Sequence, residues 1–152
     1  MQILQASIND AEGILRLQKL AFRSEAEIYN NYDLSPLQET VGEIREQFKT
    51  YTFLKAVFGE EIVGSVRAYE AAGTCYVGRL MVHPEMRNQG IGTALMSEIE
   101  SYFQPNRFEL FTGKKSENNI RLYTKLGYSI FKTEQVGCGG IEIVYMEKTS
   151  RT

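Results

Sequence analysis

A single stretch, residues 76–95, constrains the fold of this chain more than any other. Its first part, Tyr76–Val82, is mostly apolar and rich in residues that favour strands. Pro84 ends this strand, because proline has no N–H to donate to a β-ladder. After the string Arg-Asn-Gln-Gly-Ile-Gly (residues 87–92), apolar residues recur at helical spacing. The stretch therefore predicts a strand, a glycine-containing turn and a helix.

The glycines of this turn predict an anion-binding site. A helix N-terminus presents unpaired backbone N–H groups and the positive end of the helix dipole. Gly90 and Gly92 lie where the helix begins, and without side chains they let a phosphate approach the backbone. We therefore predict a phosphate-binding turn, with Arg87 as an additional cation.

The length and the charge of the chain limit the possible classes of protein. Its 152 residues suit one domain, residues 1–152, with a complete core. A formal net charge of −2 gives no overall bias toward nucleic acid. Basic residues nevertheless gather in one segment, at Lys114, Lys115, Arg121, Lys125 and Lys132. This segment is either a solvated face or, because it follows the phosphate turn closely, a contact for a polyanion.

The cysteine and histidine content argues against a metal site. The chain has two cysteines, Cys75 and Cys138, and one histidine, His83, without the spacing of metal ligands. We expect both thiols to be free in a reducing compartment. The sequence shows no apolar run of membrane-spanning length and no segment like a signal peptide. We therefore expect a cytoplasmic protein with no membrane partner.

The N-terminal part of the chain predicts a strand within residues 1–7 and then a helix. Asn9 is the expected cap of this helix, with Glu12 in the capping-box position. Residues 23–36 are irregular and rich in Asn, Tyr and Asp, which is typical of a turn or of a loop that holds a polar ligand. A second helix then starts at residues 35–38 and continues along an apolar stripe to residue 48.

The remaining sequence predicts an α/β fold with a mixed, mostly antiparallel sheet flanked by helices. The expected elements are strands 53–58, 62–69 and 76–82, a helix over 91–103, a strand at 108–111, a helix between Ser116 and Gly127, and a hairpin of strands 128–134 and 141–146 with its turn at 137–140. Gly78 lies inside its strand, where a glycine is typical of a bulge or of a close backbone approach. Strand 108–111 should lie parallel to strand 76–82, because a strand and a crossover helix precede it.

Two motifs together resemble the GCN5-related N-acetyltransferase (GNAT) family. Val-His-Pro at 82–84, followed by Arg87-x-x-Gly90-x-Gly92 and a helix, resembles the family's acyl-CoA motif. Residues 119–128, Asn-Ile-Arg-Leu-Tyr-Thr-Lys-Leu-Gly-Tyr, resemble its second signature. One helix and one strand separate the motifs, as the family requires. Two departures stand out: Ser116 replaces a frequent Asn, and strand 76–82 lacks the Glu that many members use as general base.

The resemblance implies a single acyl-CoA N-acyltransferase domain that moves an acetyl group from acetyl-CoA to a primary amine. The amine would belong to a small molecule or a protein, and it would attack directly in a ternary complex. Tyr123 would be the catalytic acid for the departing thiolate, and Lys114, Lys115 or Arg121 would meet the nucleotide phosphates. The implied cofactor-binding residues are Leu80, Met81, Val82, Arg87, Asn88, Gln89, Gly90, Ile91, Gly92, Thr93, Asn119 and Tyr123.

The acceptor amine must lose a proton before it attacks. A lysine-like amine of pKa about 10.4 is neutral in only about one molecule in 2500 at pH 7, which costs roughly 4.6 kcal/mol. Candidate bases are His83, Glu85, Asp33 and a tyrosine of residues 29–32, with ordered water as the alternative. Tyr29, Tyr32 and Asp33 are the predicted substrate-binding residues, and their acidic and aromatic character would suit a cationic amine.

Other functions remain open at this point. A non-catalytic acyl-CoA binding or sensing domain would keep the glycine turn and lose the acid and the substrate loop. A P-loop is disfavoured because no Lys-Ser/Thr follows the glycines, and no acidic residue is placed to hold a ribose as in a dinucleotide fold. Sheet edges and the final hairpin could form a homodimer.

Overall fold

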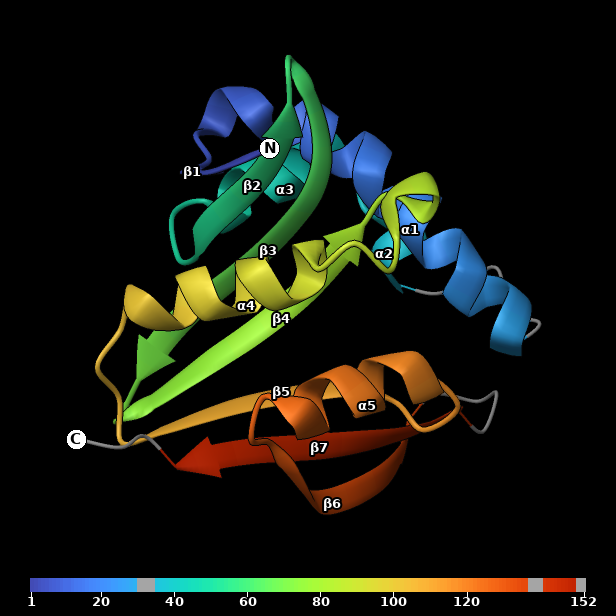
Figure 1. Cartoon of the computed structure of the whole chain (residues 1–152), viewed down its shortest axis with the longest axis vertical. Coiled ribbons are helices and arrows are strands. Elements are labelled where there is room, and N and C mark those ends of the chain that lie inside the picture. The colour runs from blue at the N-terminus through green and yellow to red at the C-terminus, as the bar shows by residue number, and fades with distance from the viewer. Residues whose placement is uncertain (30–34, 137–140, 150–152) are drawn as a thin grey trace.

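The computed structural model describes residues 1–29, 35–136 and 141–149, which form a seven-stranded, mostly antiparallel sheet flanked by helices (Figure 1). The sheet has the order β1-β2-β3-β4-β5-β7-β6. Its strands are β1 (Gln2–Gln5), β2 (Thr52–Phe58), β3 (Glu61–Ala71), β4 (Thr74–Val82), β5 (Arg107–Gly113), β6 (Ser129–Val136) and β7 (Ile141–Thr149). The helices are α1 (Ala11–Tyr29), α2 (Ser35–Gln38), α3 (Val41–Gln47), α4 (Ile91–Ser101) and α5 (Glu117–Lys125), with short 3-10 helices η1 (Ile8–Asp10) and η2 (Pro84–Met86).

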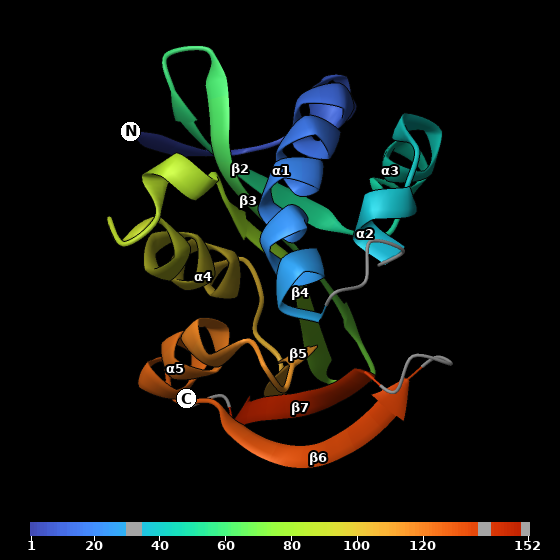
Figure 2. The ribbon, with the colours of Figure 1, turned by 90° about the vertical axis from the view of Figure 1, so that its right-hand side faces the viewer.

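The helices form a layer on each face of the sheet. Figure 2 shows α4 and α5 on one side and α1, α2 and α3 on the other. One core cluster packs α4 against the central strands, with Leu95 and Ile99 fully buried. A second cluster packs α1 and α3 against the opposite face, around Ile14 and Ile44. Helices α1, α3 and α4 therefore each bury apolar residues against the sheet.

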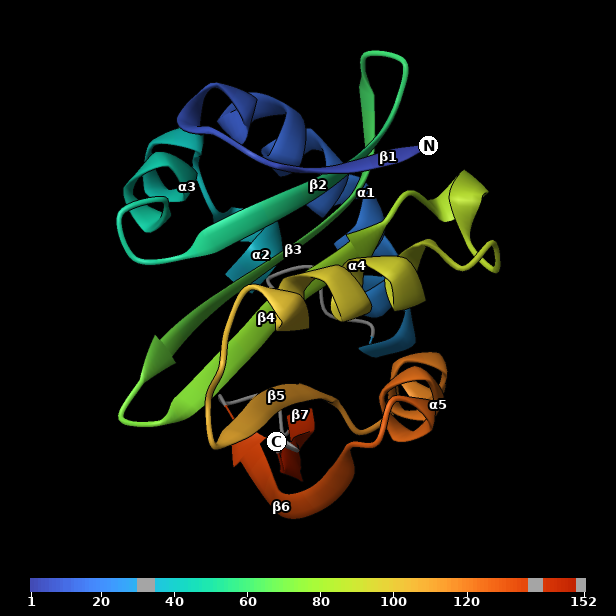
Figure 3. The same cartoon turned by 60° about the vertical axis from the view of Figure 1, so that its left-hand side comes forward.

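β4 and β5 form the predicted parallel pair, and this pair is unusually short. Only three residue pairs join them, from Thr74↔Arg107 to Tyr76↔Glu109. β4 continues to Val82 and β5 to Gly113, so the two strands separate beyond the last pair (Figures 1 and 3). In the part of the chain that the structure describes, no strand pairs with this edge of β4 after Tyr76. An open V with a free backbone edge results.

Of the two alternatives for Gly78, the structure shows a bulge in β4, immediately after this residue. Ser65 of β3 pairs with Met81, and Arg67 pairs with Gly78, so two residues of β4 oppose one of β3. Arg79, the first residue of the bulge, has a φ of 52°, which is uncommon for a residue with a side chain. The bulge re-aims the side chains that follow it.

The start and the end of α1 differ from the prediction. The one-turn helix η1 leads directly into α1, so the predicted cap Asn9 lies inside η1. Ser7 is the cap residue of η1, and its backbone N–H donates to the Asp10 carboxylate at 2.9 Å. The prediction missed this turn because Asn9 has an equally good capping side chain. At its other end α1 continues to Tyr29, where a loop was expected from residue 23. The fully buried Ala26 extends its apolar face over the sheet.

The predicted second helix is wrong as one continuous element, because it divides into α2 and α3. Thr40 starts α3 through a reciprocal capping box. Its hydroxyl accepts from the Glu43 N–H at 3.2 Å, and the Glu43 carboxylate accepts from the Thr40 N–H at 3.0 Å. Such a box satisfies two backbone groups and favours a new helix start over a continued helix. The Thr-x-x-Glu spacing was readable in the sequence.

The C-terminal elements agree with the prediction. α5 begins directly after Ser116 and ends before Gly127, whose φ of 102° is the left-handed conformation of a helix stop. β6 and β7 pair antiparallel as a hairpin, and its predicted turn, residues 137–140, lies outside the described residues. Among the described helices, none is long and apolar enough to cross a membrane.

Helix α4 packs closely on the sheet at Gly64 of β3, and a substitution there tests this contact. A Cβ at this position would lie 2.9 Å from Leu95 Cδ1 and 3.0 Å from Ile91 Cγ2, which is closer than packed carbons approach. Overpacking a core costs about 1–3 kcal/mol. We therefore expect Gly64→Ala to lower the free energy of unfolding by about this amount, measured by urea titration.

Gly42→Ala is the matched control for this substitution. In α3 the nearest atom to a Cβ at Gly42 would be Thr40 Oγ1 at 3.9 Å, an ordinary contact. Alanine also favours a helix over glycine, so stability should stay constant or rise by up to about 1 kcal/mol. Equal losses in the two variants would show that the helix–sheet contact is not the cause.

Candidate active site

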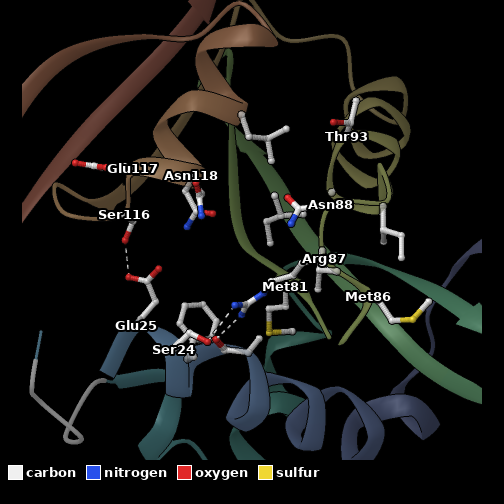
Figure 4. Close-up of a pocket in the computed structure, with 18 of the residues that line it drawn as sticks. Ser24, Glu25, Met81, Met86, Arg87, Asn88, Thr93, Ser116, Glu117 and Asn118 are labelled. Carbon is white, nitrogen blue, oxygen red and sulfur yellow. Dashed lines mark hydrogen bonds between the residues drawn. The ribbon is translucent and has the colours of Figure 1, made fainter. Parts of the chain in front are cut away.

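A cleft of about 550 Å³ opens where β4 and β5 separate. One wall is the C-terminal half of α1, and the other walls are the N-terminal ends of α4 and α5 with the end of β4 (Figure 4). Its lining residues are Ala21, Phe22, Ser24, Glu25, Ile28, Leu80, Met81, Val82, Met86, Arg87, Asn88, Gly90, Ile91, Gly92, Thr93, Lys115, Ser116, Glu117, Asn118, Asn119 and Leu122. Most of the predicted cofactor-binding residues therefore share one surface; Gln89 and Tyr123 are not in this lining.

The turn before α4 has the geometry of an anion site. Asn88 and Gly90 both have positive φ angles, 63° and 81°. Gly90 is the N-cap of α4 and supplies no side-chain cap, and the first bond within the helix runs from the Ala94 N–H to the Gly90 carbonyl. The N–H groups of residues 91–93 therefore have no partner within the helix and lie at the positive end of its dipole.

Gly92 lets the backbone of α4 approach the opposite walls closely. A Cβ there would lie 3.4 Å from Leu122 Cδ2 and 3.8 Å from Leu80 Cδ2. A methyl group would fill this space and any longer side chain would displace the walls. The free N–H groups and the lack of a side chain fit a phosphate at this end of the cleft.

Arg87 lines the cleft, but its side chain reaches across to α1. Its guanidinium donates to Ser24 Oγ at 3.1 Å and to the Ala21 carbonyl at 3.3 Å (Figure 4). To contact a phosphate as the sequence analysis predicts, the guanidinium would have to leave these partners. Arg87 in this structure links the glycine turn to α1.

The other side of the cleft is also linked to α1. The Ser116 hydroxyl donates to the Glu25 carboxylate at 2.5 Å (Figure 4). The Lys115 N–H donates to the Tyr29 hydroxyl at 2.9 Å. Tyr29 packs so closely on Gly113 that a Cβ there would collide with its ring. The second half of α1 therefore holds both sides of the V, which explains why it stays helical.

The predicted substrate residues are only partly described. Tyr29 packs on the β5–α5 turn and is not among the residues that line the cleft. Tyr32 and Asp33 lie outside the described residues. Glu25, which sequence reasoning missed, provides a carboxylate in the cleft instead. It was missed because a loop was expected from residue 23, so nothing placed Glu25 on a helix face.

Tyr123 is buried beside the cleft. Its side chain packs in the core next to Tyr128, with ring centroids 6.1 Å apart. Burial raises the pKa of the Tyr123 hydroxyl, and the nearby Glu25 charge raises it further. On the same helix, the Asn119 amide lines the cleft and donates to Thr112 Oγ1 at 3.4 Å.

His83 lies away from the cleft. Its Nδ1 accepts from the Glu85 N–H at 3.1 Å, so the ring caps η2. It borders a second, separate hollow lined by α1 and the β2–β3 turn. Of the basic segment predicted near the phosphates, Lys115 lines the cleft, whereas Lys114 pairs with Glu142 at 3.3 Å.

The described residues include one cysteine, Cys75, in the core. Cys75 is fully buried, and burial raises the pKa of its thiol to about 12, with smaller contributions from Glu70 and Glu100. A thiol held neutral in this way is a poor nucleophile. Within residues 1–29, 35–136 and 141–149, no group of three or more His, Cys, Asp or Glu side chains could hold a metal ion.

Residues 12–128 match the Acetyltransferase (GNAT) family. The chain belongs to this family. A relative, the UPF0157 protein YqkA of Bacillus subtilis (strain 168), is 25% identical over 130 residues. That match covers 85% of this chain and 37% of the relative, so the chain spans little more than a third of the relative's length.

Solved structures share the fold. Smu.2055 of Streptococcus mutans UA159 superposes with a TM-score of 0.81 at 19% identity, over 98% of this chain and 99% of that one. The PaiA N-acetyltransferase of Thermoplasma acidophilum, solved in complex with coenzyme A, superposes with a TM-score of 0.75 at 21% identity, over 98% of each chain. The GNAT fold predicted from the sequence is confirmed.

The burial of Cys75 predicts that its native thiol is inert. In a Cys138→Ser variant, we expect an aromatic disulfide reagent at pH 8 to label no thiol of the folded protein within minutes. One thiol should react once urea unfolds the chain, and the absorbance of the released reagent measures both states. Fast labelling of the folded variant would contradict the burial of this side chain.

Proposed function

We propose that this protein transfers an acetyl group from acetyl-CoA to a primary amine, which attacks directly in a ternary complex. The observation that best supports this proposal is the cleft, which extends from the uncapped N-terminus of α4 to the free edge of β4. One end of this surface suits a pyrophosphate and the other suits an extended chain with amide groups. Membership of an acetyltransferase family supports the reaction class.

The cleft residues fit acetyl-CoA, which supplies the acetyl group as an activated thioester. Backbone N–H groups of residues 87–93 would hold the pyrophosphate, each such interaction contributing about 0.3–2 kcal/mol. The free edge of β4 at Leu80–Val82 would bond the pantetheine amides as a further strand would. An N–H of the same segment would polarise the thioester carbonyl, as in an oxyanion hole. Asn119 would contribute a further polar contact.

Tyr123 would stabilise the departing thiolate by donating a hydrogen bond. A thiol has a pKa of about 8.5 and an unperturbed tyrosine about 10, so full proton transfer is already uphill. Burial raises the pKa of Tyr123, which makes complete transfer still less favourable. The hydroxyl would therefore act as a hydrogen-bond donor and keep its proton, and the departing thiolate would take its proton from water.

We assign Glu25 as the general base that accepts the proton of the acceptor amine. Its carboxylate lines the cleft and is held in place by the Ser116 hydroxyl. An opposite charge beside the acceptor would orient an ammonium group, and the carboxylate can then take its proton directly or through water. This replaces the carboxylate that β4 lacks, because the bulge there holds Arg79 instead.

The decisive experiment measures release of coenzyme A from acetyl-CoA over a broad library of amines and peptides. We expect transfer to at least one class of amine, and calorimetry should show binding of coenzyme A alone. Binding without turnover on any acceptor would favour a non-catalytic acyl-CoA sensor. Absence of both would remove the proposal.

Substituting Tyr123 by Phe tests the thiolate donor. A hydrogen bond to a charged group contributes about 1.5–3 kcal/mol, so we expect kcat to fall by about 10- to 100-fold at an unchanged KM for acetyl-CoA. Tyr102→Phe, at the exposed end of α4, is the control and should leave kcat unchanged. If Tyr123→Phe kept its kcat across the pH range, the tyrosine would have no role in the chemical step.

A further inference from the structure

Two arginines lie side by side on the face of the sheet that α1 and α3 cover. Arg67 comes from β3 and Arg79 from the bulge of β4. Only 9% of Arg67 and 18% of the Arg79 side chain are exposed. Burial lowers the pKa of both guanidinium groups, and the charge of Arg79 lowers that of Arg67 further.

Among the described residues, these two cations share one carboxylate. Arg79 Nη2 lies 3.6 Å from Glu39, which also accepts from the side-chain amides of Gln18 at 2.7 Å and Gln47 at 2.6 Å. Arg67 donates from Nη1 to the Gln47 side-chain oxygen. The group therefore carries one positive charge in excess, in a place where an unbalanced charge is unfavourable.

Both guanidinium groups also retain unused donors. Arg67 Nε and Arg79 Nη1 are buried and have no hydrogen-bond partner in the structure as described. Arg107 on β5 is a useful contrast, because it bonds Glu109 at 2.9 Å and Glu147 at 2.8 Å. The chain thus supplies carboxylates to one arginine of the sheet and leaves two others short of them. Buried donors of this kind need a partner, which a water molecule, an ion or an oxyanion of a ligand can provide.

Open space lies next to this pair. Gly78 pairs directly with Arg67 across the β3–β4 ladder, and a Cβ on Gly78 would meet no atom within 4 Å. The residues after the bulge, Leu80 and Met81, already line the cleft. A molecule with its amine in the cleft could therefore place a second group over Gly78, against the arginines.

We propose that Arg67 and Arg79 bind an oxyanion of the acceptor, so that the preferred acceptor is a small amine that also bears a carboxylate or a phosphate. Guanidinium groups bind such planar or tetrahedral oxyanions through paired N–H donors. This inference rests on the proposed acetyl transfer and names its substrate class. It differs from the cationic amine expected from Tyr29, Tyr32 and Asp33, of which the structure describes only Tyr29.

Matched pairs of acceptors test this assignment. Each pair differs only in the anion: an amino acid and its amide, and an amino-alkyl phosphate and the corresponding amino alcohol. We expect kcat/KM for acetyl transfer to be at least tenfold higher for the anionic member of one pair. Which pair shows this difference tells whether the site prefers a carboxylate or a phosphate. Arg67→Gln and Arg79→Gln should remove the preference. Arg45→Gln, an exposed arginine of α3 near Glu12, should retain it.

A binding measurement separates this inference from the proposed function. N-acetylglycine or inorganic phosphate should raise the melting temperature of the wild-type protein, and N-acetylglycinamide should not. Arg67→Lys and Arg79→Lys keep the charge and serve if the glutamine variants fail to fold. If the protein neither binds coenzyme A nor transfers an acetyl group to any acceptor, the proposed function is contradicted, whereas a thermal shift by an oxyanion would still support the anion site. Equal transfer within both pairs, or a preference for diamines, with no thermal shift by either oxyanion would overturn this inference.

Discussion

The separation of β4 from β5 is the constraint on which the site depends. A parallel ladder that stops after Tyr76↔Glu109 leaves backbone groups of β4 without a strand partner, and such groups are costly if buried and useful if a ligand pairs them. Helix α1 is hydrogen-bonded to both sides of the V, at Arg87 and at Ser116. The same helix also forms one wall of the cleft, so it links the two sides that the separated strands leave open.

The bulge gives β4 a second role. After the bulge, the strand lines the cleft with Leu80–Val82. At the bulge, Arg79 lies on the α1 face, near Arg67 and Glu39. One strand therefore borders both the proposed cofactor surface and the proposed acceptor surface. Direct transfer between two bound molecules needs such a meeting point, because the reacting atoms must come within about 3–3.5 Å.

Local signals predicted most of the fold, and tertiary contacts decided what they missed. The meander, the glycine turn before α4 and the parallel pair follow from periodicity, turn chemistry and crossover handedness. The extension of α1 to Tyr29 does not, since it depends on partners about 90 residues away in the β5–α5 turn. For the same reason Glu25 was invisible as a site residue. In the sequence, Arg79 only marked a strand without the family's frequent glutamate. Its ion pair with Glu39 was not predicted, because Glu39 lies at the break between α2 and α3, which was not expected.

The lack of a carboxylate on β4 is consistent with the proposed role of the arginine pair, because both keep the local charge positive. A positive charge near an amine lowers the pKa of that amine, and each unit lowered removes about 1.4 kcal/mol of the cost of deprotonation. Arg67 and Arg79 would repel the ammonium form, whereas their attraction for an oxyanion on the same molecule would hold the acceptor in place. Glu25, which lines the cleft, would then receive the proton. A carboxylate on β4 would weaken this arrangement, because it would neutralise the charge that binds the acceptor.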